Sequence, residues 1–292
     1  MKKETLHTSI FLLLLLLLAD VCSAQQKAGE QPIDLTYKST LIGGGTYTLR
    51  ETYLSPEEYT GWGIRILNEQ ARNTSLLNGK MSVQQLSNIE LSSSKNRMQT
   101  ASFYHLMLDY RLGGHYHFKP IIPRLNLLAG TQANTLLGAI YNSRNGNNPV
   151  AAKAGVHLNL SGIANYSFKI SRQPVSVRYQ MDMPFVGAAF SPHYGQSYYE
   201  ISLGNTDGLV HFASFHNHFS MKNYLTVEVP LNLTTLRVTC LNSLYQTNVN
   251  GLKTQINSTT FMIGFAREIL FASPKRNKKQ PADGINYRGI FD

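Results

Sequence analysis

The chain has 292 residues, a formal net charge of +10 and a hydrophobic fraction of 42%. This length suffices for one large domain, and no stretch reaches the roughly 18 consecutive apolar residues of a transmembrane helix. Beyond a predicted leader the sequence holds one cysteine, Cys240, which excludes an internal disulfide. Because that leader predicts export, nucleic acid is not an expected partner of this basic chain.

Residues 1–24 have the organisation of a secretory signal peptide. A charged start precedes the apolar run 10–19, and Cys22 and Ala24 supply small residues at positions −3 and −1 of a cleavage site after Ala24. Such a run rises only about 15 Å as a helix, roughly half of a bilayer's hydrocarbon core, so it is too short to span. Acylation of Cys22, as in a lipoprotein, is the alternative, but the two residues before it are not small. Residues 25–37 would then form a short N-terminal periplasmic segment.

Segments further along the chain alternate apolar and polar side chains, which is the pattern of a β-strand with two different faces. In residues 104–118, YHLMLDYRLGGHYHF, Leu106 and Leu108 lie on one face and Asp109 and Arg111 on the other. In chain order the ten predicted strands are 39–53, 61–72, 82–96, 101–118, 124–141, 151–170, 175–186, 220–230, 233–248 and 253–271. A further hairpin within 197–219 would raise the number to twelve.

The strand lengths and the charges on their polar faces favour a membrane barrel. A membrane-crossing strand takes about 9–11 residues, whereas soluble strands average about 5–6. Charges of both signs recur at middle positions, where a lumen would supply partners and lipid would not. We therefore expect an all-β fold, an antiparallel transmembrane β-barrel over residues 38–271, with its apolar faces toward lipid. A soluble β-sandwich or lipocalin-like barrel is the alternative.

Eight side chains form the predicted lumen network: Arg65, Glu69, Glu90, His105, Asp109, Arg111, Arg178 and Asp182. Arg50, Arg237 and Glu268 are further candidates for the same face. We interpret the network as salt bridges that neutralise charge inside a narrow barrel, because ten strands enclose little more space than the eight that side chains can fill. The alternative is acid–base catalysis by a histidine and a carboxylate, such as His105 and Asp109.

Residues 184–219 alternate least and are predicted to form a long extracellular loop. Loops beyond about 12–15 residues are usually functional or disordered, and the aromatic side chains here argue against disorder. We expect the loop to fold over or into the barrel mouth and partly close it. Its candidate functional residues are His193, Tyr194, Ser197 and Tyr198. The serine and the histidine leave open a barrel enzyme that acts on envelope lipid or peptide.

Two further motifs have structural interpretations. Residues 43–45 are three glycines without the downstream Lys-Ser/Thr of a phosphate loop, so we expect them to permit bending or close packing in the barrel wall. The pairs His115/His117 and His216/His218 have strand spacing and could each offer two metal ligands, but neither has a further ligand nearby in sequence. The sequence therefore predicts no metal site and no cofactor.

Five stretches carry a resemblance to a known family: STLIGGGTYT at 39–48, GWGIRI at 61–66, SPHYGQSYYEISLGN at 191–205, SMKNYLTVEVPL at 220–231 and FMIGF at 261–265. They resemble a family of exported proteins of unknown function from Gram-negative gut bacteria, expected to be outer-membrane barrels. The resemblance covers about residues 38–271 and implies the fold and the location, but no catalytic or binding residues. The basic tail 272–292 departs from the usual barrel ending, in which the last strand closes the chain, and is expected to be periplasmic.

The sequence thus predicts an integral protein of the cell outer membrane, exported by its signal peptide. The expected role is non-enzymatic: a small or plugged, porin-like pore, or a structural or interaction protein of the envelope. The alternatives are a barrel enzyme acting on envelope lipid or peptide, and a soluble periplasmic β-barrel that binds an apolar ligand. Expected partners are outer-membrane lipid, the barrel-assembly machinery and, for a pore, a small solute. The pattern does not predict an oligomeric state.

Overall fold

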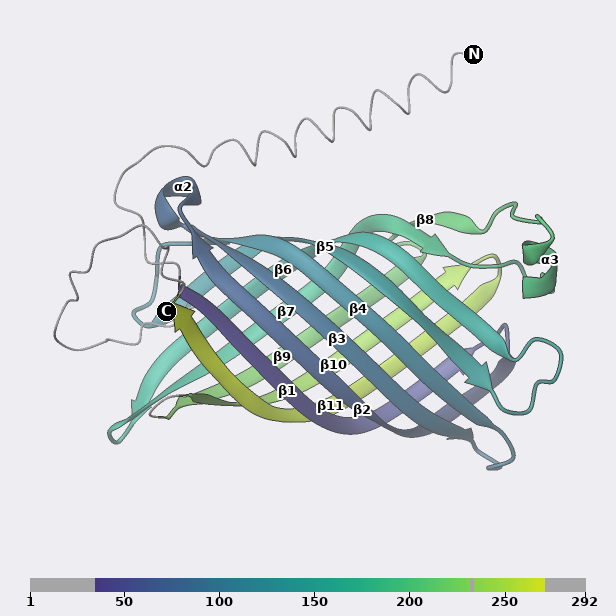
Figure 1. Ribbon diagram of the computed structural model, residues 1–292, viewed down its shortest axis with the longest axis horizontal. Coiled ribbons are helices and arrows are strands. Elements are labelled where there is room, and N and C mark those ends of the chain that lie inside the picture. The colour runs from purple at the N-terminus through teal and green to yellow at the C-terminus, as the bar shows by residue number, and fades with distance from the viewer. Residues whose placement is uncertain (1–34, 232–233, 271–292) are drawn as a thin grey trace, which may run out of the picture. The chain divides into compact units, whose positions relative to one another are not determined.

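The computed structural model describes residues 35–231 and 234–270 (Figure 1). The predicted signal peptide 1–24, most of the segment 25–37 and the tail 272–292 lie outside these residues. Over the described ranges, no helix is long and apolar enough to span a membrane. The helices α2 (Leu76–Gly79) and α3 (Tyr198–Ser202) are about one turn each.

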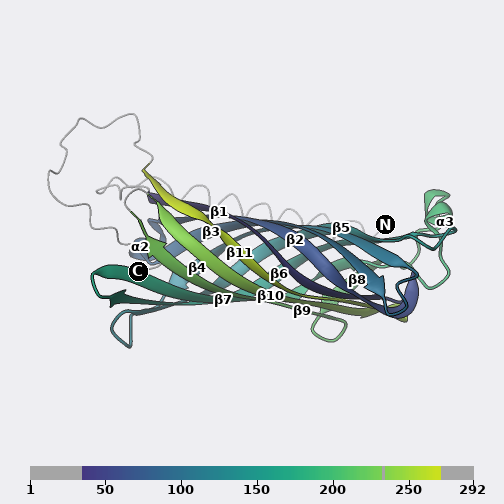
Figure 2. The same ribbon diagram turned by 90° about the horizontal axis from the view of Figure 1, so that it is seen from below.

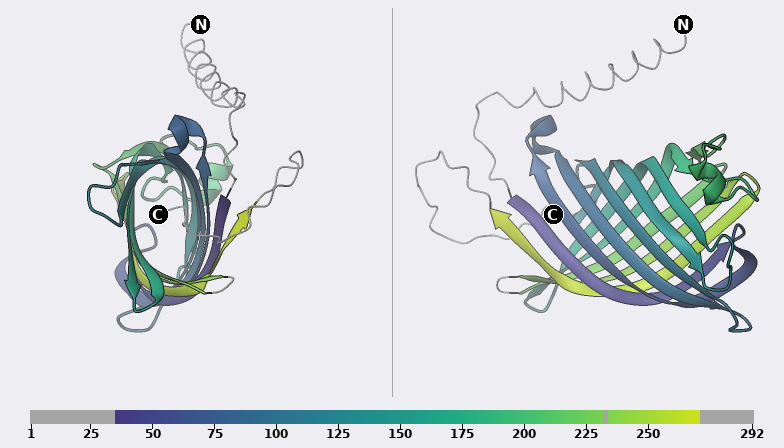
Figure 3. Two further views of the ribbon diagram at one scale, coloured as in Figure 1. Left: turned by 90° about the vertical axis from the view of Figure 1, so that its left-hand side faces the viewer. Right: turned by 45° about the vertical axis from the view of Figure 1, so that its right-hand side comes forward.

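Ten strands of the described chain form a closed antiparallel barrel, which confirms the predicted fold class. They are β1 (Leu35–Glu51), β2 (Ser55–Thr74), β3 (Met81–Asn96), β4 (Ser102–His117), β5 (Leu125–Asn142), β6 (Val150–Ile170), β7 (Gln173–Phe190), β9 (His218–Pro230), β10 (Thr235–Val249) and β11 (Leu252–Leu270). β1 pairs with β11 and β6 pairs with β7, so the sheet has no open edge between its first and last strands. Figure 3 shows the ring nearly end-on.

The loop at the mouth differs from the predicted bounds 184–219. β7 continues to Phe190 because its last residues pair with both β6 and the short strand β8 (Val210–Ser214), and β9 already begins at His218. β8 pairs with the edge of β7 beyond the point where β9 leaves it. It therefore adds one short strand at the rim, and the barrel wall stays at ten strands rather than twelve. The segment 191–217 lies at the end of the barrel away from the start of β1 (Figures 1 and 2).

Burial along the strands is inverted relative to that of a soluble protein. On β4, Leu106 and Leu108 are 41% and 42% exposed, whereas Asp109 and Arg111 are 4% and 2% exposed. Other exposed apolar side chains repeat this on the remaining strands: Ile42, Ile64, Ile66, Ile89, Leu91, Leu137, Val156, Leu158, Leu160, Met181, Leu225, Val238, Phe261, Ile263 and Phe265. A continuous apolar outer wall would be unfavourable in water and suits lipid. The fold is a transmembrane β-barrel, and a soluble barrel with an apolar interior does not fit it.

Aromatic side chains mark the two edges of the apolar wall. Near one end, the rings of Tyr104 and Tyr141 lie 6.3 Å apart, and near the other end those of Tyr116 and Phe118 lie 5.2 Å apart. The separation from Tyr104 to Tyr116 along β4, at about 3.3 Å per residue and a tilt near 45°, corresponds to about 28 Å along the barrel axis. The apolar band of an outer-membrane barrel is about 25 Å tall. The aromatic edges are therefore spaced as membrane interfaces require.

Two glycines of β1 lie where this strand closes the barrel against β11. A Cβ atom at Gly43 would lie 1.9 Å from the carbonyl oxygen of Phe261, and one at Gly45 would lie 1.9 Å from that of Thr259. Both contacts are to backbone, which cannot rotate away. The geometry agrees with the close-packing interpretation of the glycine run.

We predict that Gly43→Ala destabilises the barrel by about 1–3 kcal/mol, because the methyl group forces β1 and β11 apart. Gly162→Ala on β6 is the matched control, since a Cβ there meets nothing within 4 Å, and its effect should stay within about 0.5 kcal/mol. Urea unfolding in lipid vesicles, followed by the fluorescence of the single tryptophan Trp62, measures both. Equal unfolding midpoints for the two variants would contradict the close packing of β1 against β11.

Candidate functional site

The inward side chains include three apolar layers, which lie among buried polar and charged side chains. The largest layer lies toward the mouth and consists of Leu49, Leu54, Tyr59, Ala101, Phe103, Met107, Leu136, Ile140, Ala151, Tyr245 and Ile256. In it, the rings of Tyr59 and Phe103 stack with their centroids 3.6 Å apart. Two smaller buried clusters are Leu41, Leu67, Leu86, Tyr224, Leu241 and Met262, and Tyr37, Ala71, Leu128, Ile163 and Ala266. The wall's own side chains thus fill the barrel across much of its length.

Glu69 is the centre of one buried ionic cluster. Arg178 donates to both of its carboxylate oxygens, from Nη1 to Oε1 at 2.9 Å and from Nη2 to Oε2 at 2.7 Å. Arg237 donates to Oε2 at 2.6 Å and also forms an ion pair of 3.0 Å with Glu228. The Gln84 amide also donates to Oε1, at 2.5 Å. Side chains of β2, β7 and β10 are therefore tied together across the lumen.

Asp109 is the centre of a second ionic cluster. Arg111 donates to both of its oxygens, at 3.1 Å and 2.7 Å, and Lys222 forms an ion pair with it. Arg111 also donates to Asp182 at 2.5 Å and to the hydroxyl of Tyr224 at 2.8 Å. The cavity between these groups and the neighbouring β6 side chains has a volume of about 20 Å³. That is room for about one water molecule, not for a solute.

Amide side chains join the two clusters, and two further ion pairs complete the network. Gln84 exchanges hydrogen bonds of 3.0 Å and 3.1 Å with Gln180, which donates to Asp182 at 3.0 Å. Arg65 pairs with Glu90, whose carboxylate also accepts from Tyr47 at 3.0 Å. Toward the mouth, Lys153 pairs with Glu51 at 2.5 Å. Glu51 also accepts from Thr254 at 2.7 Å.

The network is balanced in charge. The ion pairs of this network join six cations and six anions: Arg65, Arg111, Lys153, Arg178, Lys222 and Arg237 with Glu51, Glu69, Glu90, Asp109, Asp182 and Glu228. Each charge removed from water requires a partner, since an unpaired buried charge costs several kcal/mol. The paired network therefore carries no net charge of its own.

The structure places all eight predicted network residues inside the barrel with buried side chains. It does not join His105 to Asp109: the nearest hydrogen-bonding neighbour of His105 is the Ser92 hydroxyl at 3.4 Å, and its ring lies 6.1 Å from that of Tyr47. The acid–base pairing proposed for these two residues therefore has no geometric basis. Of the further candidates, Arg237 faces inward, but Arg50 is exposed on the outer face because Leu49 takes the inward position.

Sequence reasoning missed four members of the network, Glu51, Lys153, Lys222 and Glu228, and the last two of these lie on β9. The signal was present, since Ser220, Lys222, Tyr224 and Thr226 alternate with the outward Met221, Asn223, Leu225 and Val227. The inward Tyr224 obscured this signal, because a tyrosine resembles an apolar residue in the pattern although its hydroxyl accepts a hydrogen bond from Arg111. The predicted His115/His117 pair divides between different partners, as His115 bonds Ser161 at 2.8 Å and His117 bonds Ser82 at 2.9 Å.

The segment 191–217, which we call the cap, covers part of the mouth and is hydrogen-bonded to other parts of the rim. Its Gln196 carbonyl accepts a hydrogen bond of 2.8 Å from Tyr53, which lies between β1 and β2. The Tyr198 hydroxyl accepts one of 2.6 Å from the backbone of Ala152 on β6. Asn250, in the turn before β11, donates to the Ser191 carbonyl at 3.0 Å. These contacts reach three separate parts of the rim, as a cap would.

The four loop candidates have different environments. Ser197 is the N-cap of α3: its hydroxyl accepts from the backbone of Glu200 at 3.2 Å and donates to the Glu200 carboxylate at 3.1 Å. Burial raises the pKa of Tyr198 to about 12, so this phenol stays neutral in its contact with Ala152. Tyr194 is 78% exposed. The ring of His193 lies 6.4 Å from that of His211. Ser197 thus caps the N-terminus of α3, and the hydrogen bonds of its hydroxyl described above are with Glu200 and not with a histidine.

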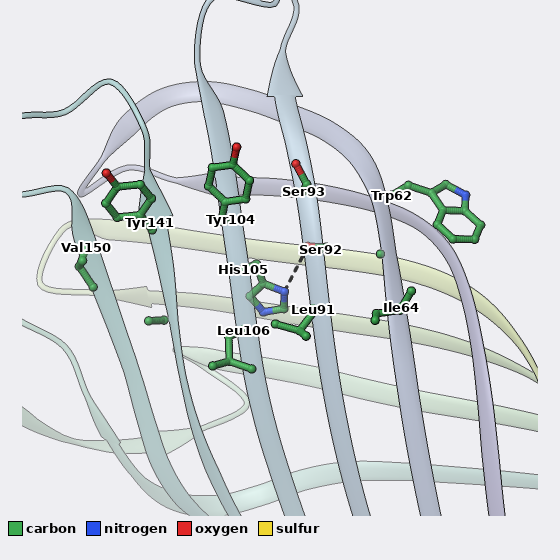
Figure 4. A pocket seen from close by; sticks show the side chains of 12 residues that line it. Trp62, Ile64, Leu91, Ser92, Ser93, Tyr104, His105, Leu106, Tyr141 and Val150 are labelled. Atoms are coloured by element: carbon green, nitrogen blue, oxygen red, sulfur yellow. Dashed lines mark hydrogen bonds between the residues drawn. The ribbon is translucent and has the colours of Figure 1, made fainter.

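An apolar hollow of about 530 Å³ lies on the outer wall near the mouth (Figure 4). Trp62, Tyr104 and Tyr141 border it, and all three are among the exposed hydrophobic side chains. The hollow arises because Ser93 stands in register between Trp62 and Tyr104, and a small side chain leaves space between large ones. Its position at the aromatic edge of the wall suits the acyl chains of lipid.

The chain belongs to a family described as "Protein of unknown function (DUF3316)", whose model matches residues 10–276. A comparison with curated proteins finds no match. Solved barrels of low similarity include the transport unit of the autotransporter AIDA-I from Escherichia coli, with 9% identity, 85% of this chain and 93% of that chain covered, and a TM-score of 0.47.

Two others are the outer membrane protease OmpT from Escherichia coli, with 8% identity over 84% of this chain and 99% of that chain and a TM-score of 0.41, and the translocator domain of the autotransporter NalP from Neisseria meningitidis. The NalP domain has 12% identity over 85% of this chain and 95% of that chain, with a TM-score of 0.41. At these identities and scores, none of the three bears on the function of this chain.

We predict that Glu69→Gln lowers the free energy of unfolding by about 3–5 kcal/mol, because Arg178 and Arg237 would then face each other without a shared carboxylate. The exposed Glu58→Gln, on the same strand, should change it by no more than about 0.5 kcal/mol. Urea unfolding in vesicles measures both. A Glu69→Gln barrel as stable as the parent would mean that the cluster contributes nothing to the fold.

Proposed function

We propose that this protein is a closed outer-membrane β-barrel that acts through its membrane-facing wall and its two ends, as a structural or interaction protein of the envelope, and does not conduct solutes. The single observation that supports this most is the burial of the inward side chains. On β4, inward-facing Phe103, His105 and Met107 are 0%, 2% and 2% exposed. In a water-filled pore, side chains at these positions would contact solvent.

The apolar wall, its two aromatic edges and the charge-balanced interior support a location in an outer membrane, where transmembrane barrels of this kind occur. The predicted signal peptide would supply export, and outer-membrane lipid and the barrel-assembly machinery would be the obligatory partners. The segment 191–217 would face the cell exterior, because the longer loops of such barrels are extracellular. A Gram-negative gut bacterium as the source stays a prediction from the family resemblance.

The experiment is single-channel conductance of refolded protein in a planar bilayer. The intact protein should be silent. A variant in which an Asn-Gly turn replaces residues 192–208 should also be silent, because the lumen is filled by wall side chains and not by the cap. The excision is geometrically mild, since the backbone of Ser191 already donates to that of Leu209 at 2.9 Å.

Heat-modifiable migration on gels confirms that both proteins form barrels, and a known porin refolded in the same way serves as the positive control. Steady conductance steps from the intact protein would overturn the proposal. Steps from the excised variant alone would mean that the cap is a gate, and the barrel would then be a regulated pore rather than a closed one.

A further inference from the structure

A second hollow, of about 250 Å³, lies on the outer face at the mouth end of β1, β11, β10 and β9. In register across these strands, Arg50 pairs with Gln255, Gln255 with Gln246, and Gln246 with Phe219. The lining also includes Lys253, Phe215 and His216. We refer to this hollow as the rim groove. Its lining residues come from four neighbouring strands and from the turn before β9.

The lining combines positive charge with aromatic rings. Arg50 and Lys253 are both exposed on the outer face, and none of the side chains that line the groove is a carboxylate. Phe215 and Phe219 are 43% and 38% exposed. The remaining lining residues are mostly amides and threonines, which can donate to or accept from a polar headgroup. This is the composition that an anion attached to an apolar group requires.

The groove is held in shape by backbone hydrogen bonds. On one side, Lys253 and Thr52 exchange two bonds, of 2.8 Å to the threonine hydroxyl and 3.0 Å to the lysine carbonyl. On the other side, the backbone of Asn248 donates to that of Asn217 at 2.8 Å, and Asn217 accepts from Ser214 at 3.0 Å. The turn that carries Phe215 and His216 is thereby fixed against β10. A site held in advance loses less entropy on binding.

The position of the groove relative to the apolar wall selects the type of ligand. On β11 the exposed apolar side chains end at Phe261, and the outward positions from there to the mouth are Thr259, Asn257, Gln255 and Lys253. The two cations therefore stand beyond the hydrocarbon-facing part of the wall, at the level where lipid headgroups lie. Cations at such a level attract anionic headgroups, whereas the phenylalanines can contact the first part of the acyl chains.

We propose that the rim groove binds the phosphorylated headgroup of an outer-leaflet lipid, with Arg50 and Lys253 contacting the phosphate and Phe215 and Phe219 contacting the lipid below it. The inference rests on the proposed placement in an outer membrane with 191–217 outside, and it does not depend on whether the lumen conducts. Arg50 supplies a planar guanidinium that can bind phosphate with two parallel hydrogen bonds, and Lys253 adds a point charge.

The test is native mass spectrometry of the full-length protein in zwitterionic detergent, titrated with bisphosphorylated lipid A and, separately, with its dephosphorylated form. The parent protein should retain the phosphorylated lipid at least about ten-fold more tightly than the dephosphorylated one. The double variant Arg50→Gln/Lys253→Gln should lose that difference. Lys95→Gln, which removes an exposed cation from the mouth end of β3, is the matched control and should bind like the parent.

A second variant tests the sign of the charge effect. Glu58 is exposed and stands in register beside Arg50, so Glu58→Gln should tighten binding, by about two-fold to five-fold. Every variant must show heat-modifiable migration. Equal binding by the parent and the double variant would overturn the site. Displacement of the lipid by inorganic phosphate would assign the groove to a soluble anion instead of a lipid, which would also overturn the proposal.

Discussion

The fold depends on buried carboxylates that are each shared between two cations. Glu69 on β2 holds Arg178 of β7 and Arg237 of β10, and Asp109 on β4 holds Lys222 of β9 together with its neighbour Arg111. None of the cross-lumen partners lies on a strand next to that of its carboxylate. Backbone pairing fixes only adjacent strands, so these contacts fix the position of opposite walls relative to each other.

The same contacts also favour one strand register over a register shifted by one residue. Because side chains alternate with a period of two, a slip of one residue on β7 would turn Arg178 toward lipid, where an arginine near the bilayer midplane costs about 2–4 kcal/mol. It would also leave Glu69 buried with one cation fewer. Both penalties act in the same direction, so a polar interior can specify the structure even though a buried ion pair contributes little net stability by itself.

Much of the fold was predictable because the alternation is a property of each strand alone. The two faces of β4 can be identified from its own sequence, because Leu106 lies on one face and Asp109 and Arg111 lie on the other. The ten strands are predicted from repeats of that alternation. The cross-lumen partners could not be predicted, since Glu69 and Arg237 are 168 positions apart and nothing in one strand's pattern encodes the position of another. Arg50 shows where prediction from alternation fails. Near a strand end, the alternation no longer distinguishes a lumenal charge from a charge at the membrane surface.

In the closed barrel that we propose, the outer surfaces are the ones that act, and these surfaces are not uniform. The wall between the aromatic edges is apolar, the mouth end has the cap fixed by Tyr53, Tyr198 and Asn250, and the rim groove places two cations beside two aromatic rings. The groove and the cap share the segment 191–217, because the turn with Phe215 and His216 borders the groove while α3 lies over the mouth. A lipid held in the groove would therefore contact the same segment that a protein partner outside the cell would meet first. Lipid binding and recognition at the mouth would then be coupled through one loop, without any passage through the lumen.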